Sequence, residues 1–179
     1  NQNYFSKIVL LDPTLFVPRI IYMWKIALFL GIQRQFHPWI NSTLKRKMTY
    51  DNYEKIFKSY REKNVFSKIS NNNLEIYINS ITKEVSDQVH ITYSKDWEYQ
   101  IYKAGLIADM YIWRNIKSIN LPCLIIRAEN SNAFLDSSQR KIEKLNSNIQ
   151  FTTLKKSTHL FPLEYPKETH NLIKTFINN

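Results

Sequence analysis

The chain has 179 residues, a formal charge of +10 and a pI of about 9.6. This length allows one domain with a substantial core. Two glycines are too few for the glycine-rich loops of a complete α/β enzyme. The lysines are scattered, and the tight basic cluster at residues 44–47 is not accompanied by a nucleic-acid-binding motif. We therefore expect no nucleic-acid partner.

The single cysteine, Cys123, excludes an intrachain disulfide and fits a reducing compartment. We expect a cytoplasmic protein without a signal peptide. The apolar stretch 16–32 is interrupted by Pro18, Arg19 and Lys25, and it falls short of the roughly 20 apolar residues that a membrane span requires. We expect a buried or partner-facing helix there and no transmembrane segment, with interfacial membrane contact as the lesser alternative.

The first predicted element is a strand over residues 7–11, a continuous apolar run that ends at Asp12 and Pro13. Such a run is typical of a strand buried on both faces. Ligands of open α/β sheets gather at the carboxyl ends of the strands, so Asp12 is a candidate site residue. The alternative is an ordinary turn residue before proline.

Residues 18–117 are predicted to be largely helical. Apolar side chains recur at helical spacing over 20–31, 49–62, 73–85, 95–103 and 108–119. Their aromatic stripes are more typical of core packing than of a cofactor site. A helical insert between two buried strands can also lie over the carboxyl ends of those strands and form the wall of a pocket.

The strand pattern then returns, in alternation with helices. Two further strands are predicted over 121–127 and 149–154, followed by helices over 137–145 and 166–177 respectively. This alternation predicts parallel strands joined by right-handed crossovers. A sheet of three strands leaves the first one with an open edge, so we expect additional sheet from the same or another chain.

A histidine after the last strand and an acid-bearing loop after the preceding strand are typical of the base and acid members of a nucleophile–base–acid triad. Through three segments, 7–13, 113–134 and 158–166, the chain resembles the C-terminal half of the α/β-hydrolase superfamily. The resemblance implies a partial α/β-hydrolase fold of the α/β class, with three parallel strands, flanking helices and a helical cap insert. Its expected parts are a core strand in 1–17, the cap in 18–117 and the C-terminal part of the core in 118–179.

The resemblance implies that His159 is the general base. The family's usual acid position holds Asn132, which cannot stabilise an imidazolium by charge. Asp12 is the first alternative acid, because some members of the superfamily place their acid after the strand that precedes the cap. Asp136 and Glu129 follow it as further alternatives.

The nucleophile elbow Gly-x-Ser-x-Gly is absent, because the only glycines are Gly31 and Gly105. Ala128 and Thr158 also stand where the family usually has glycine. The resemblance implies hydrolysis of a small apolar ester-like substrate only if a nucleophile-bearing N-terminal half completes the chain. The residues expected to line the substrate pocket, with core packing as the alternative, are Trp24, Phe29, Trp97, Tyr102 and Trp113.

Two other readings remain open. The chain could be a non-catalytic hydrolase remnant that serves as an interaction or structural subunit. It could also be a basic protein that binds an anionic partner with salt-dependent affinity. We expect no cofactor and no metal, and we expect the first strand to pair with the missing half, with another protein chain or with a second copy of this one.

Overall fold

The computed structural model describes residues 4–179 and divides them into two compact units. The first, here called the sheet unit, combines the chain up to Ile26 with Leu106–Asn179. The second, the insert unit, is Ala27–Gly105. The sequence places the corresponding boundaries at 17/18 and 117/118, and the identification of the insert as a cap stays a prediction.

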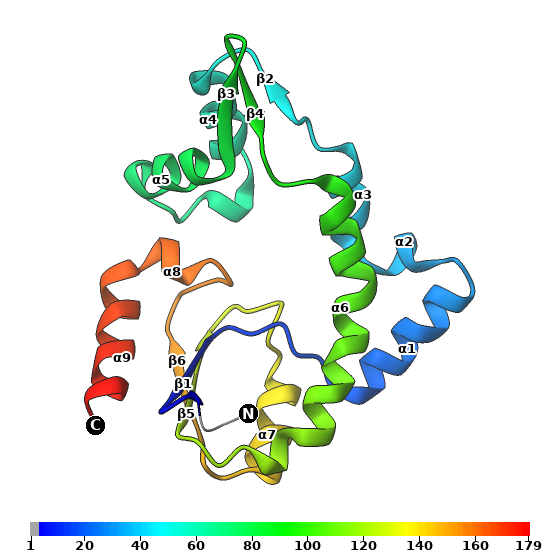
Figure 1. Cartoon of the computed structure of the whole chain (residues 1–179), viewed down its shortest axis with the longest axis vertical. Coiled ribbons are helices and arrows are strands. Elements are labelled where there is room, and N and C mark those ends of the chain that lie inside the picture. Colours follow the sequence, from blue (N-terminus) through cyan, green and yellow to red (C-terminus); the bar gives the residue numbers. More distant parts are fainter. Residues whose placement is uncertain (1–3) are drawn as a thin grey trace. The chain divides into compact units, whose positions relative to one another are not determined.

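The sheet unit contains the three parallel strands that the sequence predicts (Figure 1), and hydrogen bonds join them in the order β1-β5-β6. In the register, Ile8 lies opposite Cys123, which in turn lies opposite Ile149. The central strand therefore has partners on both sides, whereas β1 lies at an edge. The strands are β1 (Ile8–Leu11), β5 (Cys123–Ala128) and β6 (Ile149–Leu154).

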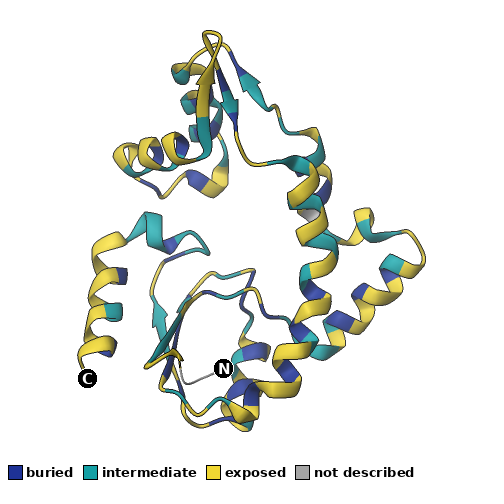
Figure 2. Ribbon diagram, viewed as in Figure 1, coloured by how far each residue is buried: buried dark blue, intermediate teal, exposed yellow. Residues whose placement is uncertain are grey.

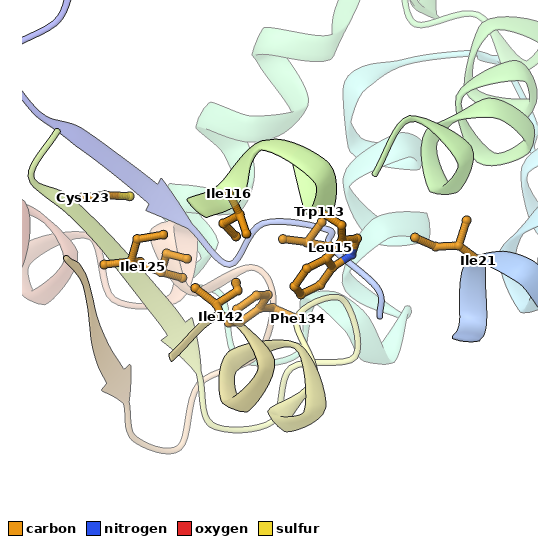
Figure 3. Close-up of a cluster of buried hydrophobic side chains, with 9 residues drawn as sticks. Leu15, Ile21, Trp113, Ile116, Cys123, Ile125, Phe134 and Ile142 are labelled. Atoms are coloured by element: carbon orange, nitrogen blue, oxygen red, sulfur yellow. The ribbon is translucent and has the colours of Figure 1, made fainter. Parts of the chain in front are cut away.

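Both faces of β5 are buried, which explains its continuous apolar sequence. Cys123 and Ile125 point into a cluster with Ile142 of helix α7 (Asp136–Leu145), which Figure 3 shows together with Phe134. The alternate residues of β5 face a second cluster, whose buried members are Leu124, Ile126, Ala128, Phe161 and Phe176. Helices α7 and α9 thus cover opposite faces of the sheet.

Helix α9 (Pro166–Asn178) is the last element, and its exposed side faces away from the sheet (Figure 2). Thr169 and Phe176 are buried on its inner side. The Lys7 ammonium donates hydrogen bonds to the carbonyls of Phe176 and Ile177, over 3.1 and 2.7 Å. A cation at a helix C-terminus stabilises the unpaired carbonyls there, so this contact joins the start of β1 to the end of the chain.

After β1 the chain passes through Phe16, whose backbone N–H and carbonyl are both held by helix α6 (Lys95–Asn115). The Phe16 N–H donates to Asp109 Oδ2 over 3.1 Å, and Trp113 Nε1–H donates to the Phe16 carbonyl over 2.6 Å. Asp109 is almost fully buried, and burial raises its pKa to about 6. The two side chains are one helical turn apart, so a single helix face holds the two peptide groups that flank the Phe16 Cα.

The insert unit differs from the sequence prediction, because it contains a small antiparallel sheet of order β2-β4-β3 as well as helices. Two of its strands form a hairpin whose turn residues, Ser86 and Asp87, have φ angles of +50° and +59°. Two positive φ angles are the signature of the tight turn that joins antiparallel strands. The predicted helix over 73–85 therefore ends at Ile81, where the β-branched Thr82 begins a strand.

The bounds of other helices in the insert unit also differ from the predicted ones. The helix expected over 49–62 begins at Tyr53, because the Asn52 side chain accepts from Lys55 N–H over 2.9 Å and caps it. The helices expected over 95–103 and 108–119 are one helix, α6, which Gly105 does not interrupt. Helix α6 and helix α1 (Pro18–Phe29) both cross the unit boundary. The other α-helices and strands of the insert unit are α2 (Gln33–Phe36), α3 (Pro38–Lys45), β2 (Thr49–Tyr50), α4 (Tyr53–Arg61), α5 (Asn71–Ile81), β3 (Thr82–Val85) and β4 (Gln88–Ile91).

Among the residues that the structure describes, no helix combines the length and the apolar character needed to cross a bilayer.

Candidate active site

The candidate site lies at the carboxyl edge of the parallel sheet. Asp12 follows β1 directly, and His159 lies in the loop after β6. Because the strands are parallel, their C-terminal ends meet at the same edge. There the His159 Nδ1 atom lies 2.8 Å from Asp12 Oδ2.

Asp12 is fully buried and accepts hydrogen bonds at both carboxylate oxygens. Ala128 N–H donates to Oδ1 over 3.0 Å, and the Ser131 hydroxyl donates to Oδ2 over 2.6 Å. The backbone of Asp12 has φ +44°, in the left-handed region that aspartate adopts more readily than most residues. Such a backbone persists only where its surroundings hold it, and functional sites are enriched in it.

The carboxylate of Asp12 selects the tautomer of His159 that fits their contact. An ionised carboxylate can only accept hydrogen bonds, so the 2.8 Å contact requires His159 Nδ1 to carry the proton. In the neutral ring, Nε2 then holds a lone pair and can accept a proton. The His159 side chain is 41% exposed, whereas Asp12 is completely shielded from water. In this arrangement His159 could accept a proton at Nε2 while Asp12 holds Nδ1.

Thr158 and Glu164 hold the histidine loop in shape. Thr158 N–H donates to Glu164 Oε2 over 2.9 Å, the Thr158 hydroxyl donates to Glu164 Oε1, and Leu160 N–H donates to the same hydroxyl over 3.3 Å. Glu164 ends the short helix α8 (Phe161–Glu164) that follows His159. Thr158, at the position where the α/β-hydrolase pattern usually has glycine, therefore stabilises this loop through its hydroxyl group.

The carboxylates of the loop after β5 are engaged elsewhere. Glu129 accepts from Lys156 N–H over 2.8 Å and from Lys155 Nζ over 3.0 Å, and these contacts lower its pKa. Asp136 pairs with Arg127. Of the three carboxylates considered from the sequence, Asp12 is the one that contacts His159.

Asn132 is exposed, and its side chain makes no hydrogen bond to any residue that the structure describes. The loop reaches the site through the neighbouring Ser131, which the sequence reasoning missed. The available signal was weak: a hydroxyl side chain close behind the strand that pairs with the Asp12 strand.

The five predicted pocket residues fall into both units. In the sheet unit, Trp24 and Trp113 are buried, and Trp113 belongs to the core cluster of Figure 3. In the insert unit, Phe29 and Trp97 are 89% and 71% exposed. Tyr102 is half-buried, and burial together with the neighbouring Glu98 raises its pKa to about 12. Their role as pocket walls stays a prediction.

Among residues 4–179, no three His, Cys, Asp or Glu side chains form a group that could hold a metal ion.

No family model matches the chain, and the curated proteins contain no match to it. Solved structures do match. The peroxisomal α/β-hydrolase Lpx1 from Saccharomyces cerevisiae is 15% identical with a TM-score of 0.74, over 99% of this chain and 47% of its own. E-2-(acetamidomethylene)succinate hydrolase is 15% identical with a TM-score of 0.70, over 97% of this chain and 58% of its own. An esterase from M. tuberculosis is 10% identical with a TM-score of 0.67, over 97% and 55%.

At these identities the similarity concerns the fold. The chain spans about half the length of the structures that it matches. Nearly the whole of this chain is matched in each of them, and its sequence lacks the nucleophile elbow. The chain therefore has the fold of the C-terminal half of an α/β-hydrolase.

Proposed function

We propose that the chain is the base-and-acid part of an α/β-hydrolase that cleaves a small apolar ester-like substrate once a nucleophile-bearing part completes it. The contact between His159 Nδ1 and the buried carboxylate of Asp12 carries this proposal. In it the insert unit is the cap, and a cytoplasmic location is expected from the single, buried Cys123.

The free edge of β1 is the proposed docking place for that part. Among the strands that the structure describes, β1 pairs with β5 alone, and Leu10 and Leu11 on it are each 38% exposed. A parallel strand added there would bring its own carboxyl end to the edge that holds Asp12 and His159. That strand would come from an N-terminal half or from another chain. A second copy of this chain could cover the edge without supplying an elbow, because it lacks the glycines.

The reaction would proceed by acyl transfer. The supplied hydroxyl attacks the ester carbonyl while His159 Nε2 takes its proton, and the protonated His159 then gives that proton to the departing alcohol. Water releases the acyl group by the same steps. Asp12 would keep Nδ1 protonated throughout and stabilise the imidazolium by its charge.

The test is reconstitution with a companion chain that contains Gly-x-Ser-x-Gly after a strand. A chromogenic ester should be hydrolysed by the two chains together and by neither alone, and His159→Ala should abolish the turnover. Turnover by the 179-residue chain alone would show that the nucleophile lies within it. Turnover that survives His159→Ala would remove the proposed base.

A non-catalytic subunit is the second candidate. The absent elbow and the outward-facing Asn132 favour it. In that case, a complex would form through β1 but would show no ester hydrolysis that depends on His159.

A further inference from the structure

The Ser131 hydroxyl has three hydrogen-bond partners in the site. It accepts from Ala133 N–H over 3.1 Å and from Phe134 N–H over 2.9 Å, and it lies 2.6 Å from Asp12 Oδ2. Amide N–H groups can only donate, so these two contacts occupy the lone pairs of the hydroxyl oxygen. Its single proton is therefore directed at Asp12.

The loop itself determines this orientation. A serine hydroxyl that accepts from the second and third following amides forms a local turn, so its geometry does not depend on His159. Ala133 and Phe134 are buried in the sheet unit, and Arg127 Nε donates to the Phe134 carbonyl over 3.2 Å. The hydroxyl is thus presented from a loop that the core holds in place.

Through Ser131 the carboxylate of Asp12 is held at both oxygens. Oδ1 receives the Ala128 N–H, and Oδ2 receives Ser131 and His159. Two donors from β5 and its loop hold the carboxylate plane, and the remaining acceptor direction of Oδ2 is the one that His159 Nδ1 uses. Without the hydroxyl, one oxygen would be left with the histidine as its sole partner.

We infer that Ser131 is a positioning residue, which orients Asp12 and thereby fixes His159 in the Nδ1–H tautomer. The inference rests on the proposed function, because the tautomer matters for the base role of His159. It also gives the loop after β5 a part in the site, although its Asn132 has none.

The experiment measures the tautomer in the full 179-residue chain. Histidine is labelled with ¹⁵N, and the ring signals of His159 are identified by their loss in His159→Gln. In the unsubstituted chain, we expect the pattern of a single Nδ1–H tautomer at a pH at which the imidazole ring is uncharged. Ser131→Ala should replace it with the averaged pattern of two tautomers, and Ser131→Thr, which keeps the hydroxyl, should restore it.

Ser138→Ala is the matched control. Ser138 is buried, whereas Ser131 is partly buried, and the Ser138 hydroxyl donates to the Leu15 carbonyl over 2.6 Å, away from Asp12. Even if Ser138→Ala destabilises the chain as much as Ser131→Ala does, the His159 signals should stay unchanged. A loss of stability by itself does not change the tautomer of His159.

The outcomes separate the two proposals. A folded Ser131→Ala chain that keeps the single Nδ1–H pattern overturns the role of Ser131. If Asp12→Asn also keeps it, the Asp12–His159 pair of the proposed function fails as well; if Asp12→Asn loses it, only the role of Ser131 fails. Should Ser131→Ala not fold, Ser131→Cys replaces it, because a thiol is a weak donor of similar shape. An unchanged pattern in that variant overturns the inference equally.

Discussion

The sheet unit contains two buried aspartates whose surroundings differ. Asp12, at the end of β1, receives three hydrogen bonds, from a backbone amide, a hydroxyl and a histidine. Asp109, on α6, receives one, from the Phe16 amide, and burial raises its pKa to about 6. Both lie within the same unit, and both are shielded from water.

The difference shows that burial alone does not determine the environment of a carboxylate, because the number of hydrogen-bond donors around it also matters. A buried negative charge is tolerated only where donors replace the lost water, and three donors do this better than one. Asp109 acts with Trp113 as a clamp on Phe16, a task that a neutral side chain could also perform. Asp12 is held by three donors spread over both of its oxygens, and an amide side chain, with a single acceptor oxygen, cannot receive them in the same way. Replacing the two aspartates should therefore change the molecule in opposite directions.

The largest effect should appear in the turnover of the completed enzyme. Asp12→Asn should lower kcat by about 10⁴-fold, the loss that the same change causes in a serine protease, because the amide favours the wrong tautomer of the histidine. Ester hydrolysis by the reconstituted complex measures it. Asn132→Ala, in the loop position where the family usually has its acid, is the control and should leave kcat unchanged. An equal loss from both variants would mean that Asp12 has no special role.

Asp12→Ala should also reduce the free energy of unfolding of the chain, by about 3–5 kcal/mol. The buried Ala128 N–H and the Ser131 hydroxyl would lose their acceptor, and alanine tolerates the left-handed backbone less well than aspartate. Urea unfolding followed by tryptophan fluorescence measures the change. Asn132→Ala should stay within about 0.5 kcal/mol of the unsubstituted chain, as surface substitutions usually do. A small loss from Asp12→Ala would show that the two donors find other partners.

The parallel sheet could be predicted from the sequence because its strands are apolar runs of a recognisable kind. β5 is covered on both faces and β1 ends abruptly before Asp12. The length of each apolar run and the residues that end it are therefore enough to predict these strands. The small sheet of the insert could not be predicted in the same way. Its strands have two to four residues, too few for a period-2 pattern to stand out beside helices.

The site was only partly predictable, because it depends on contacts between distant residues. Asp12 and His159 are 147 positions apart in the sequence, and the choice among Asp12, Asp136 and Glu129 needs coordinates. The contribution of Ser131 depends on a loop conformation that no spacing rule describes. The motif position pointed to Asn132, but that side chain is directed to solvent in the structure.

Asp109→Asn should have the opposite sign to Asp12→Ala and should raise the free energy of unfolding by about 2–3 kcal/mol above pH 7. The folded chain holds the Asp109 proton up to about pH 6, whereas the ordinary aspartate pKa is 3.8. Between these values the folded state binds more protons than the unfolded state, so this group's contribution to stability falls as the pH rises through the window. Asparagine removes the cost of burying the charge, about 1.4 kcal/mol per pKa unit, and keeps an acceptor for Phe16.

The measurement is the difference in unfolding free energy between Asp109→Asn and the unsubstituted chain from pH 4 to pH 8. The difference should grow between pH 4 and pH 6 and then level off. Asp87→Asn, at an exposed turn, is the control and should show no such growth. A difference that is independent of pH would mean that Asp109 is charged in the folded chain throughout.

The smallest effect should come from Thr158→Val, which keeps the shape of the side chain and removes its hydroxyl. The hydroxyl donates to Glu164 and accepts from Leu160 N–H, so its loss should lower the free energy of unfolding by about 1 kcal/mol. Thr153→Val on β6 is the matched control, because the Thr153 side chain has no hydrogen-bond partner among the described residues. Thermal unfolding of both variants measures the difference. If both lose the same amount, Thr158 contributes only its shape, and the histidine loop is held by the backbone contact of Thr158 N–H with Glu164.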